Sequence, residues 1–286
     1  MKIIDILNSG KTCLSFEVFP PKKSDTEATV TEAAAKIAAL QPGYMSVTYG
    51  AGGSTDIYTA KIAQQINRMG VTPLAHLSCI GAGRDRIRAA LEDMRDKGIE
   101  NILALRGDLP EGVENPLCDY LHASDLVRDI KQAGGFCIGG ACYPEGHPES
   151  ESIAKDIEGL KIKVDAGCEF LTTQMFFDND ILYNFMYRLL KAGVDVPVVP
   201  GIMPVTNAKQ IKRITSISGT ALPKRFERLV DRYGDNPEAM KQAGIAYATE
   251  QIIDLYANGF NGVHVYSMNK PEVAEKISEN LSEIIK

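Results

Sequence analysis

Short runs of apolar and β-branched residues alternate along the chain with longer segments whose apolar residues recur at helical spacing. Eight of these runs have the length and composition of buried strands. They are Cys13–Phe19, Tyr44–Tyr49, Thr72–Ser78, Asn101–Leu105, Phe136–Cys142, Phe170–Gln174, Val196–Pro200 and Gly262–Tyr266. Alternating strands and helices predict a parallel sheet with right-handed crossovers, and eight such units favour a closed (β/α)8 TIM barrel over an open sheet.

Two of the intervening segments illustrate the helical pattern. One has Ser54 as its expected N-cap and ends at Gly70, and the next ends at Gly98. Both carry apolar residues spaced by four and then three positions, which marks one face of a helix. These stripes are Ile62, Ile66 and Met69 in the first segment, and Ile87, Leu91 and Met94 in the second.

The stretch from Ser218 to Asn261 is too long to be one loop. Its pattern predicts two extra helices, about Pro223–Tyr233 and Pro237–Ala257, inserted before the last strand. The chain contains no linker, low-complexity tract or internal repeat, so we expect residues 1–286 to form a single (β/α)8 catalytic domain.

Composition narrows the class of protein. The 286 residues are close in number to the ~250 of a typical barrel, and 44% of them are hydrophobic and 24% charged, as in a soluble globular protein. A net charge of -6 offers no basic surface, so neither nucleic acid nor an anionic membrane is an expected partner. The N-terminus lacks the apolar region of a signal peptide and no stretch has the length of a membrane span, so we expect a cytoplasmic protein.

The familiar metal and nucleotide motifs are missing from the sequence. The six cysteines lack CxxC spacing and suit reduced core thiols, and the four histidines lack HExxH spacing, so no metal site is expected. Neither Gly50–Thr55 nor Gly81–Arg86 completes the GxGxxG fingerprint of a Rossmann site. Gly10–Thr12 imitates the end of a P-loop, but Asp5 stands where that loop needs a glycine.

Glu17 lies in the apolar run Leu14–Phe19, near the end of a predicted strand. Its apolar neighbours would desolvate the carboxyl group and raise its pKa, as suits a general acid. The alternative is a carboxylate at the barrel rim that pairs with Lys22 or Lys23.

Arg106, Gly107 and Asp108 follow the strand that ends at Leu105. Gly107 would let a ligand approach the backbone closely, and Asp108 can accept hydrogen bonds from a heterocycle. Alternatively, Asp108 caps a turn or pairs with Arg106 at the end of the barrel.

The loop after the fifth strand offers an aromatic face and an imidazole, from Tyr143 and His147. It is either part of a binding site or an ordinary surface loop. The helix that follows places Asp156, Gly159 and Lys163 on one face. Gly159 costs about 1 kcal/mol relative to alanine within a helix, so either another group packs closely there or the helix is weak.

Two further strand ends are polar. Gln174 ends the sixth strand among aromatic residues, where its amide would bind a flat polar ligand or cap the next helix. Tyr266 ends the eighth strand and is followed by Lys270, which suits an anionic tail or is simply an exposed lysine at a helix start.

Taken in order, these segments resemble methylenetetrahydrofolate reductase of the bacterial, FAD-dependent, catalytic-domain-only type. Each segment is weakly specific alone, but nine in order are strongly specific, and the resemblance covers nearly the whole chain. The segments are Ser15–Pro21, Ser46–Gly50, Ala75–Leu77, Ala104–Pro110, Ala123–Val127, Tyr143–Glu145 with His147–Pro148, Lys163–Gly167, Thr173–Gln174 with Phe176–Asp178, and Pro200–Val205.

The resemblance implies a barrel that binds FAD at the C-terminal ends of its strands. In the family, FAD takes hydride from NADH or NADPH and passes it to 5,10-methylenetetrahydrofolate, which becomes 5-methyltetrahydrofolate. By position, Glu17 is the acid that helps to open the folate's five-membered ring, and Asp108 lies beside the flavin and the pterin. The substrate-binding positions are Glu17, Gln174, Gln210, Tyr266 and Lys270. The FAD-binding positions are Thr48, His76, Arg106, Gly107, Asp108, His122, Ala123, Tyr143, His147, Asp156 and Lys163.

The chain departs from the family pattern at four positions. Gly159 and Ile162 replace a polar and a basic FAD contact, and His122 stands where tyrosine is common. Ile214 stands where an aromatic residue can flank the ligand stacked on the flavin. These departures keep a second hypothesis open, in which a partner subunit rather than NADH delivers the electrons. We also expect a homo-oligomer.

A third hypothesis is a barrel enzyme without flavin, such as an aldolase. A Schiff-base lysine of a barrel should lie within a strand, and none of the predicted strands contains a lysine, which argues against it. The colour of the purified protein and its response to NADH separate the three hypotheses.

Overall fold

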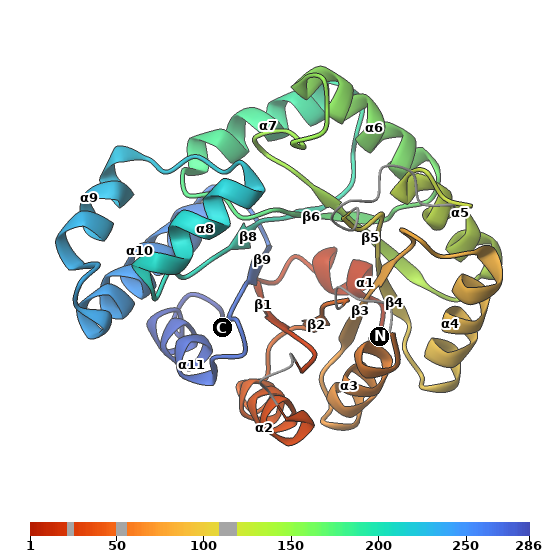
Figure 1. Ribbon diagram of the computed structural model, residues 1–286, viewed down its shortest axis with the longest axis horizontal. Helices are drawn as coiled ribbons and strands as arrows, with labels where there is room; N and C mark the ends of the chain where they lie inside the picture. Colours follow the sequence, from red (N-terminus) through yellow and green to blue (C-terminus); the bar gives the residue numbers. More distant parts are fainter. Residues whose placement is uncertain (22–25, 50–55, 109–118) are drawn as a thin grey trace.

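The computed structural model describes residues 1–21, 26–49, 56–108 and 119–286. Its centre is a parallel sheet of nine short strands in the order β7-β6-β5-β4-β3-β2-β1-β9-β8, and helices surround this sheet (Figure 1). The strands are β1 Cys13–Val18, β2 Met45–Val47, β3 Pro73–Ser78, β4 Asn101–Leu105, β5 Cys137–Cys142, β6 Phe170–Thr173, β7 Val198–Val199, β8 Gly201–Ile202 and β9 Gly262–Val265. The predicted TIM barrel is confirmed, with strand ends that differ from the prediction by at most two residues.

The predicted seventh strand is divided into two pieces. β7 pairs with β6, β8 pairs with β9, and Pro200 lies between the two pieces. Proline has no backbone N–H to donate to a ladder, which explains the break. The Pro200 carbonyl still accepts from His264 N at 2.8 Å, so the chain passes from one piece to the other and joins the two edges of the sheet into a barrel.

The helices alternate with the strands as the spacing predicted. They are α1 Ile3–Leu7, α2 Glu27–Ala38, α3 Asp56–Arg68, α4 Arg84–Asp96, α5 Ala123–Ala133, α6 Ile153–Asp165, α7 Asn179–Lys191, α8 Ala208–Ser218, α9 Lys224–Tyr233, α10 Pro237–Ala257 and α11 Pro271–Asn280. The stripe residues of α3 and α4 are buried except Met69, which lies beyond the end of α3 and is 39% exposed. Ser54, the expected N-cap of α3, lies outside the described residues.

The two predicted extra helices are present as α9 and α10. They close a satellite core in which Phe226 stacks on Phe177 at 5.1 Å and contacts Tyr247 at 4.7 Å. Gly244 of α10 is required here, because an added Cβ would lie 1.8 Å from the carbonyl oxygen of Val205. The helix therefore packs directly on the backbone that follows β8, and this contact fixes one wall of the barrel mouth.

The barrel interior has an apolar floor that sequence patterning did not predict. Ile3 and Leu7 of α1 pack against a layer from the strands that includes Tyr44, Leu103 and Phe170. The short helix α1 thus closes the N-terminal end of the barrel, and Figure 1 shows it near the centre of the ring. The open end is therefore the one at which the strands terminate, as is usual for the active sites of such barrels.

Five of the six cysteines are buried free thiols, as predicted, and Cys118 lies outside the described residues. Among the described helices, none combines the length and the apolar character needed to cross a bilayer.

Candidate active site

Glu17 lies near the end of β1 and is 6% exposed. Burial raises the pKa of its carboxyl group to about 8, and the Ser46 hydroxyl opposes that rise only in part. Among the described residues, no lysine or arginine forms an ion pair with it; Lys22 and Lys23, the alternative partners, lie outside the described residues. Glu17 is therefore a neutral carboxylic acid at neutral pH, as the sequence predicted.

His76 of β3 faces this acid. Its Nε2 atom lies 3.7 Å from Glu17 Oε2, both side chains are nearly buried, and the nitrogen has no hydrogen-bond partner among the described residues. Burial lowers the pKa of His76 to about 3, so its ring is neutral at physiological pH. The two side chains are therefore both uncharged at neutral pH, and they face each other without a direct hydrogen bond.

A second buried histidine, His264, lies in the same part of the barrel, on the strand that pairs with β1. His264 of β9 is bonded through Nδ1 to Ser15 Oγ at 2.8 Å and through Nε2 to Ser46 Oγ at 3.0 Å. Its ring stacks on Tyr44 at 5.6 Å and meets Tyr266 edge-on at 5.4 Å. Burial, reinforced by His76, lowers its pKa to about 3, so this ring is also neutral.

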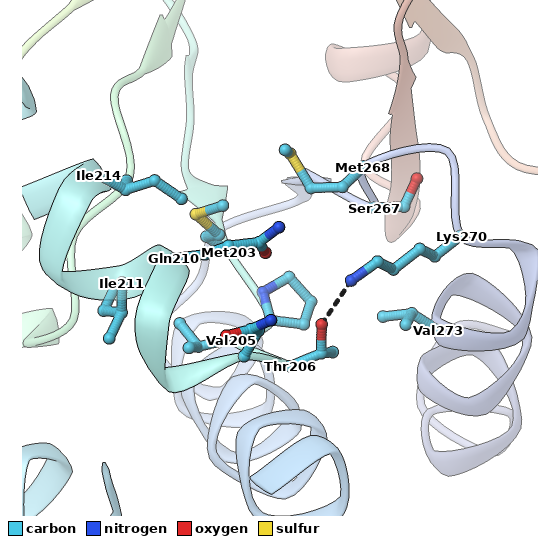
Figure 2. Close-up of a pocket in the computed structure, with 12 residues that line it drawn as sticks. Met203, Val205, Thr206, Gln210, Ile211, Ile214, Ser267, Met268, Lys270 and Val273 are labelled. Carbon is cyan, nitrogen blue, oxygen red and sulfur yellow. Dashed lines mark hydrogen bonds between the residues drawn. The ribbon is translucent and has the colours of Figure 1, made fainter. Parts of the chain in front are cut away.

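A pocket lies between the segment after β8 and the loop after β9, and it is lined by Ser267, which donates to the Glu17 carbonyl (Figure 2). Of the predicted substrate positions, Gln210 and Lys270 line it, together with Ile214, whereas Glu17, Gln174 and Tyr266 are not among its lining residues. Lys270 reaches across to donate to Thr206 Oγ1 at 2.6 Å, and desolvation lowers the pKa of its ammonium group. Tyr266, half-buried at the end of β9, donates instead to the Thr173 carbonyl at 2.5 Å.

The ends of β4 and β5 carry charged groups. Arg106 forms a two-pronged ion pair with Glu149, with distances of 2.6 and 2.7 Å. This contact raises the pKa of Arg106 and lowers that of Glu149. Asp108 is exposed, and among the described residues it forms no direct pair with Arg106; the turn that it was predicted to cap lies outside the described residues. The partner of Arg106, Glu149, was missed by the sequence interpretation.

Gly107 is needed for packing. Its φ is +90°, and an added Cβ would lie 2.1 Å from Ser78 Oγ, whose hydroxyl donates to the Arg106 carbonyl at 2.9 Å. The structure therefore accounts for this glycine by the turn and by the neighbouring strand, without the close approach of a ligand that the sequence suggested.

Tyr143 and His147 form the aromatic part of the loop after β5. Their rings meet edge-on with centroids 4.6 Å apart. His147 Nδ1 accepts from Glu149 N at 3.1 Å, so the proton of the neutral ring lies on Nε2. Asp156 holds this loop by accepting from His147 N at 3.1 Å.

On α6, Lys163 is half-buried and donates to the Ala141 carbonyl at 2.7 Å; burial lowers the pKa of its ammonium group. Gly159 has no described atom within 4 Å of a Cβ added to it, so close packing does not explain it. Ile162 is 51% exposed. Gly159 therefore lies exposed within a continuous helix, and neither of the two explanations left open for it is tested.

The remaining predicted positions lie around the same end of the barrel. Thr48 follows β2, and His122 and Ala123 begin α5, where the N–H of His122 donates to Asp125 at 3.0 Å. Gln174 follows β6, and its Oε1 atom accepts from Met175 N at 2.9 Å. It does not cap the next helix, because Asp178 is the N-cap of α7.

Sequence reasoning missed the polar residues inside the barrel, above all Ser15, Ser46 and His264. A signal for them was present. Polar residues recur at every second position in otherwise apolar strands, as in Ser15 with Glu17, and His76 with Ser78. A period of two places such residues on one face of a strand, here the face toward the barrel interior.

A closed barrel that presents a neutral carboxylic acid beside an imidazole at its open end is a barrel enzyme equipped for proton-assisted chemistry on an organic substrate. Comparison with known proteins places it more narrowly. Residues 2–282 match the methylenetetrahydrofolate reductase family. The chain belongs to this family and is an oxidoreductase.

Relatives are similar along most of the chain. The 5,10-methylenetetrahydrofolate reductases of Pectobacterium carotovorum and Escherichia coli K12 are each 37% identical over 273 residues, covering 95% of this chain and 91% of theirs. Methylenetetrahydrofolate reductase (NADH) 1 of Arabidopsis thaliana is 37% identical over 300 residues, or 98% of this chain and 51% of the plant protein.

One solved structure supports the fold independently. An uncharacterized protein from Clostridium thermocellum that binds two copies of 5-methyl-5,6,7,8-tetrahydrofolic acid superposes with a TM-score of 0.68, covering 99% of this chain and 100% of that one. At 15% identity, the likeness concerns the fold.

Proposed function

We propose that this chain, as a single catalytic domain, reduces 5,10-methylenetetrahydrofolate to 5-methyltetrahydrofolate with hydride from NADH or NADPH passed through bound FAD. The observation that carries the proposal is the neutral Glu17 carboxyl at the open end of the barrel, in a chain of this family. The folate bound by the Clostridium thermocellum neighbour and the NADH in the name of the plant relative support the choice of substrate and donor.

Reduction of the methylene bridge requires one proton and one hydride. Glu17 gives its proton to a nitrogen of the folate's five-membered ring, and the bond from that nitrogen to the bridging carbon breaks. The iminium that results accepts hydride at the same carbon, which becomes the methyl group. A carboxyl group with a pKa of about 8 keeps its proton at neutral pH until a base of suitable strength is placed against it.

The residues at the open end fit FAD. His76 Nε2 is a buried ring nitrogen without a partner, which a polar atom of a flat heterocycle would satisfy. Arg106 and Lys163 supply positive charge for a pyrophosphate, and Tyr143 with His147 supplies aromatic surface. When bound, FAD would take hydride from the nicotinamide and deliver it to the folate carbon.

The folate would extend from Glu17 across the mouth of the pocket that Gln210 and Lys270 line. Gln174 has an amide nitrogen without a partner among the described residues, so it is free to donate to the pterin. Gln210 is exposed on α8 at the edge of the same pocket, and Tyr266 lies at the end of β9. Lys270 would exchange its bond to Thr206 for a carboxylate of the folate tail.

An anaerobic spectral titration tests this function. The protein is loaded with FAD, NADH is added, and 5,10-methylenetetrahydrofolate follows once excess nucleotide is removed. We expect loss of the yellow flavin absorbance with NADH and its return with the folate. A protein that cannot retain FAD, or a reduced flavin that the folate does not reoxidise, would contradict the proposal.

The same titration identifies the electron donor. Ile214 offers an aliphatic wall where a ring would stack better against nicotinamide, so we expect NADH to act with weak apparent affinity. If millimolar NADH leaves the flavin oxidised while dithionite reduces it, the electrons come from a protein partner instead.

We also propose a homo-oligomer. Tyr187 and Leu190 of α7 are 65% and 71% exposed, and Ile253 of α10 is 41% exposed. Exposed apolar residues of this size favour contact with another copy. Sedimentation equilibrium across protein concentrations would show the oligomer, and a monomer at every concentration would exclude it.

A further inference from the structure

We propose that Asn269, with Ser267, is a positioning residue: the loop between β9 and α11 holds the end of β1, and thereby the Glu17 carboxyl, at the mouth of the barrel. This inference rests on the proposed function for the role of Glu17 as an acid. The contacts that support it come from a loop in which the sequence indicated only Tyr266 and Lys270 as site residues.

Three hydrogen bonds join this loop to the end of β1. Asn269 accepts from Phe19 N through Oδ1 at 2.8 Å and donates through Nδ2 to the Phe19 carbonyl at 3.0 Å. Ser267 is 1% exposed, and its hydroxyl donates to the carbonyl of Glu17 itself at 2.9 Å. One side-chain amide therefore satisfies both backbone groups of Phe19, and Ser267 fixes the residue that bears the acid.

The backbone of the loop is held in an unfavourable conformation. Met268 and Asn269 have φ values of +56° and +55°. Asparagine tolerates this left-handed region, but a residue such as methionine adopts it only when surrounding contacts impose it. The paired bonds between Asn269 and Phe19 are contacts of that kind, so the loop and the strand end constrain each other.

The same loop also reaches the parts of the site assigned to folate. The Tyr266 hydroxyl bonds to the carbonyl of Thr173, the residue before Gln174, and Lys270 bonds to Thr206 on the opposite wall of the pocket. Figure 2 shows Ser267, Met268 and Lys270 around that pocket. The loop thus sets the distance between the acid and the residues that would hold its substrate.

Loss of the Asn269 bonds would let the end of β1 move and admit water to the carboxyl group. Burial is what raises the pKa of Glu17, so solvation would lower it from about 8 toward its ordinary value. Among the described residues, the titratable groups around Glu17 are His76, His264 and Tyr266. All three are neutral between pH 5 and 9, since burial lowers the pKa of both histidines and raises that of the tyrosine.

Asn269→Gly is the sharpest variant, because glycine adopts the same φ without strain while it removes both bonds to Phe19. Gln41→Gly is the matched control. Gln41 has a φ of +53°, is exposed, and lies in the loop before β2, at the closed end of the barrel. Both substitutions place glycine at a backbone position with a left-handed φ. They therefore raise the conformational entropy of the unfolded chain by a similar amount.

The first readout does not depend on activity. Infrared spectra of the FAD-loaded protein are recorded across pH, and the band of the Glu17 carboxylic acid is assigned by its absence in Glu17→Gln. We expect the midpoint of this band near pH 8 in the wild type and in Gln41→Gly, and at least one pH unit lower in Asn269→Gly. An unchanged midpoint in a folded Asn269→Gly protein would overturn the inference.

The second readout is the folate half-reaction. We expect Asn269→Gly to reoxidise reduced flavin at least about threefold more slowly at pH 7.5, since a one-unit fall in the pKa from about 8 lowers the protonated fraction at this pH by about that factor. The rate of flavin reduction should be unchanged. Ser267→Ala tests the same contact without altering the left-handed turn, and it should shift the midpoint in the same direction. If the wild type shows the carboxyl band but no folate reduction, the positioning role stands and the proposed function fails.

Discussion

The two sides of the barrel mouth differ in the burial and the charge of their functional side chains. On β1, β3 and β9 themselves the functional side chains Glu17, His76 and His264 are buried and uncharged at neutral pH, and hydrogen bonds hold His264 and the backbone of Glu17. Around β4 and β5 they are more exposed and charged, and they are held by ion pairs such as Arg106 with Glu149.

This difference matches what each side is proposed to do. A proton donor must be fixed in position and kept from ionising in water, and desolvation with rigid neighbours achieves both. A surface that binds phosphate must exchange one anionic partner for another, and a partly solvated ion pair costs little to break. The side around β1 is therefore predicted to control the rate of chemistry, and the side around β4 the affinity for cofactor.

The largest effect should follow from Glu17→Gln. The amide keeps the shape of the side chain and cannot deliver a proton, so we expect the folate half-reaction to slow by ~10²–10⁴-fold. Stopped-flow measurement should find flavin reduction unchanged. Glu169→Gln is the control, since this half-buried glutamate bonds to Ile138 N at the opposite end of the barrel. A loss below tenfold in Glu17→Gln would mean that another group protonates the folate.

The same substitution should alter the pH dependence of stability. The pKa of Glu17 is raised on folding, so the folded wild type binds one proton more than the unfolded chain between pH 4.5 and about 8. Its contribution to the unfolding free energy is complete below pH 4.5 and declines by up to about 1.4 kcal/mol per pH unit as pH rises through that window. His76 contributes with the opposite sign but only below pH 6.5.

Urea denaturation of both proteins between pH 6.5 and 8 isolates the Glu17 contribution. We expect the wild type to lose stability relative to Glu17→Gln as pH rises through this interval. Parallel curves would show that the carboxyl group is already ionised in the folded protein and that its environment is not desolvating.

Ile214→Phe should produce a moderate effect on the use of NADH. An aromatic flank improves stacking by about 0.5–1.5 kcal/mol, so the apparent affinity for NADH in the anaerobic reduction of the flavin should improve by up to about tenfold. Ile214→Leu controls for a change of shape without a ring. If neither variant nor the wild type is reduced by NADH, the donor is a partner protein.

The smallest effect is expected for Glu149→Gln. Removing this charge releases Arg106 for the cofactor, and because partly exposed ion pairs contribute about 0–1 kcal/mol, FAD affinity should rise only a few-fold. Fluorescence quenching of FAD measures it. Glu250→Gln, which breaks the exposed pair with Arg225 on α9 and α10, should leave FAD binding unchanged. Weaker FAD binding in Glu149→Gln would show that Glu149 holds Arg106 in the position that binds FAD, and that it does not compete with FAD for Arg106.

The sequence predicted the barrel because its signals are local. Alternating strands and helices, and long helices with caps such as Asn236, follow from spacing and side-chain chemistry within a few residues. The sequence did not predict that Pro200 divides the seventh strand into two, although this proline is present in the predicted range. It also did not predict α1, since a five-residue helix has no periodicity to detect and its role depends on strands that lie far along the chain.

For the candidate site too, the sequence predicted the local features and not the long-range contacts. Glu17 was recognisable as a carboxylate within an apolar strand, and its burial follows from those neighbours. The contacts that hold it were not recognisable. Asn269 and Phe19 are 250 positions apart, as are Ser267 and Glu17, and only closure of the barrel brings them together. The sequence also did not reveal the ion pair between Arg106 and Glu149, which occupies the guanidinium group predicted to bind a ligand.

The central claim is that Glu17 is a neutral acid at physiological pH and gives its proton to the folate. The most direct test is the pH dependence of flavin reoxidation by 5,10-methylenetetrahydrofolate in the pre-reduced wild type and in Glu17→Gln. The account predicts a wild-type rate that is constant near neutrality and falls above about pH 8, and a slow variant rate without that decline. A decline with the same midpoint in Glu17→Gln, or a wild-type midpoint near pH 4.5, would contradict it.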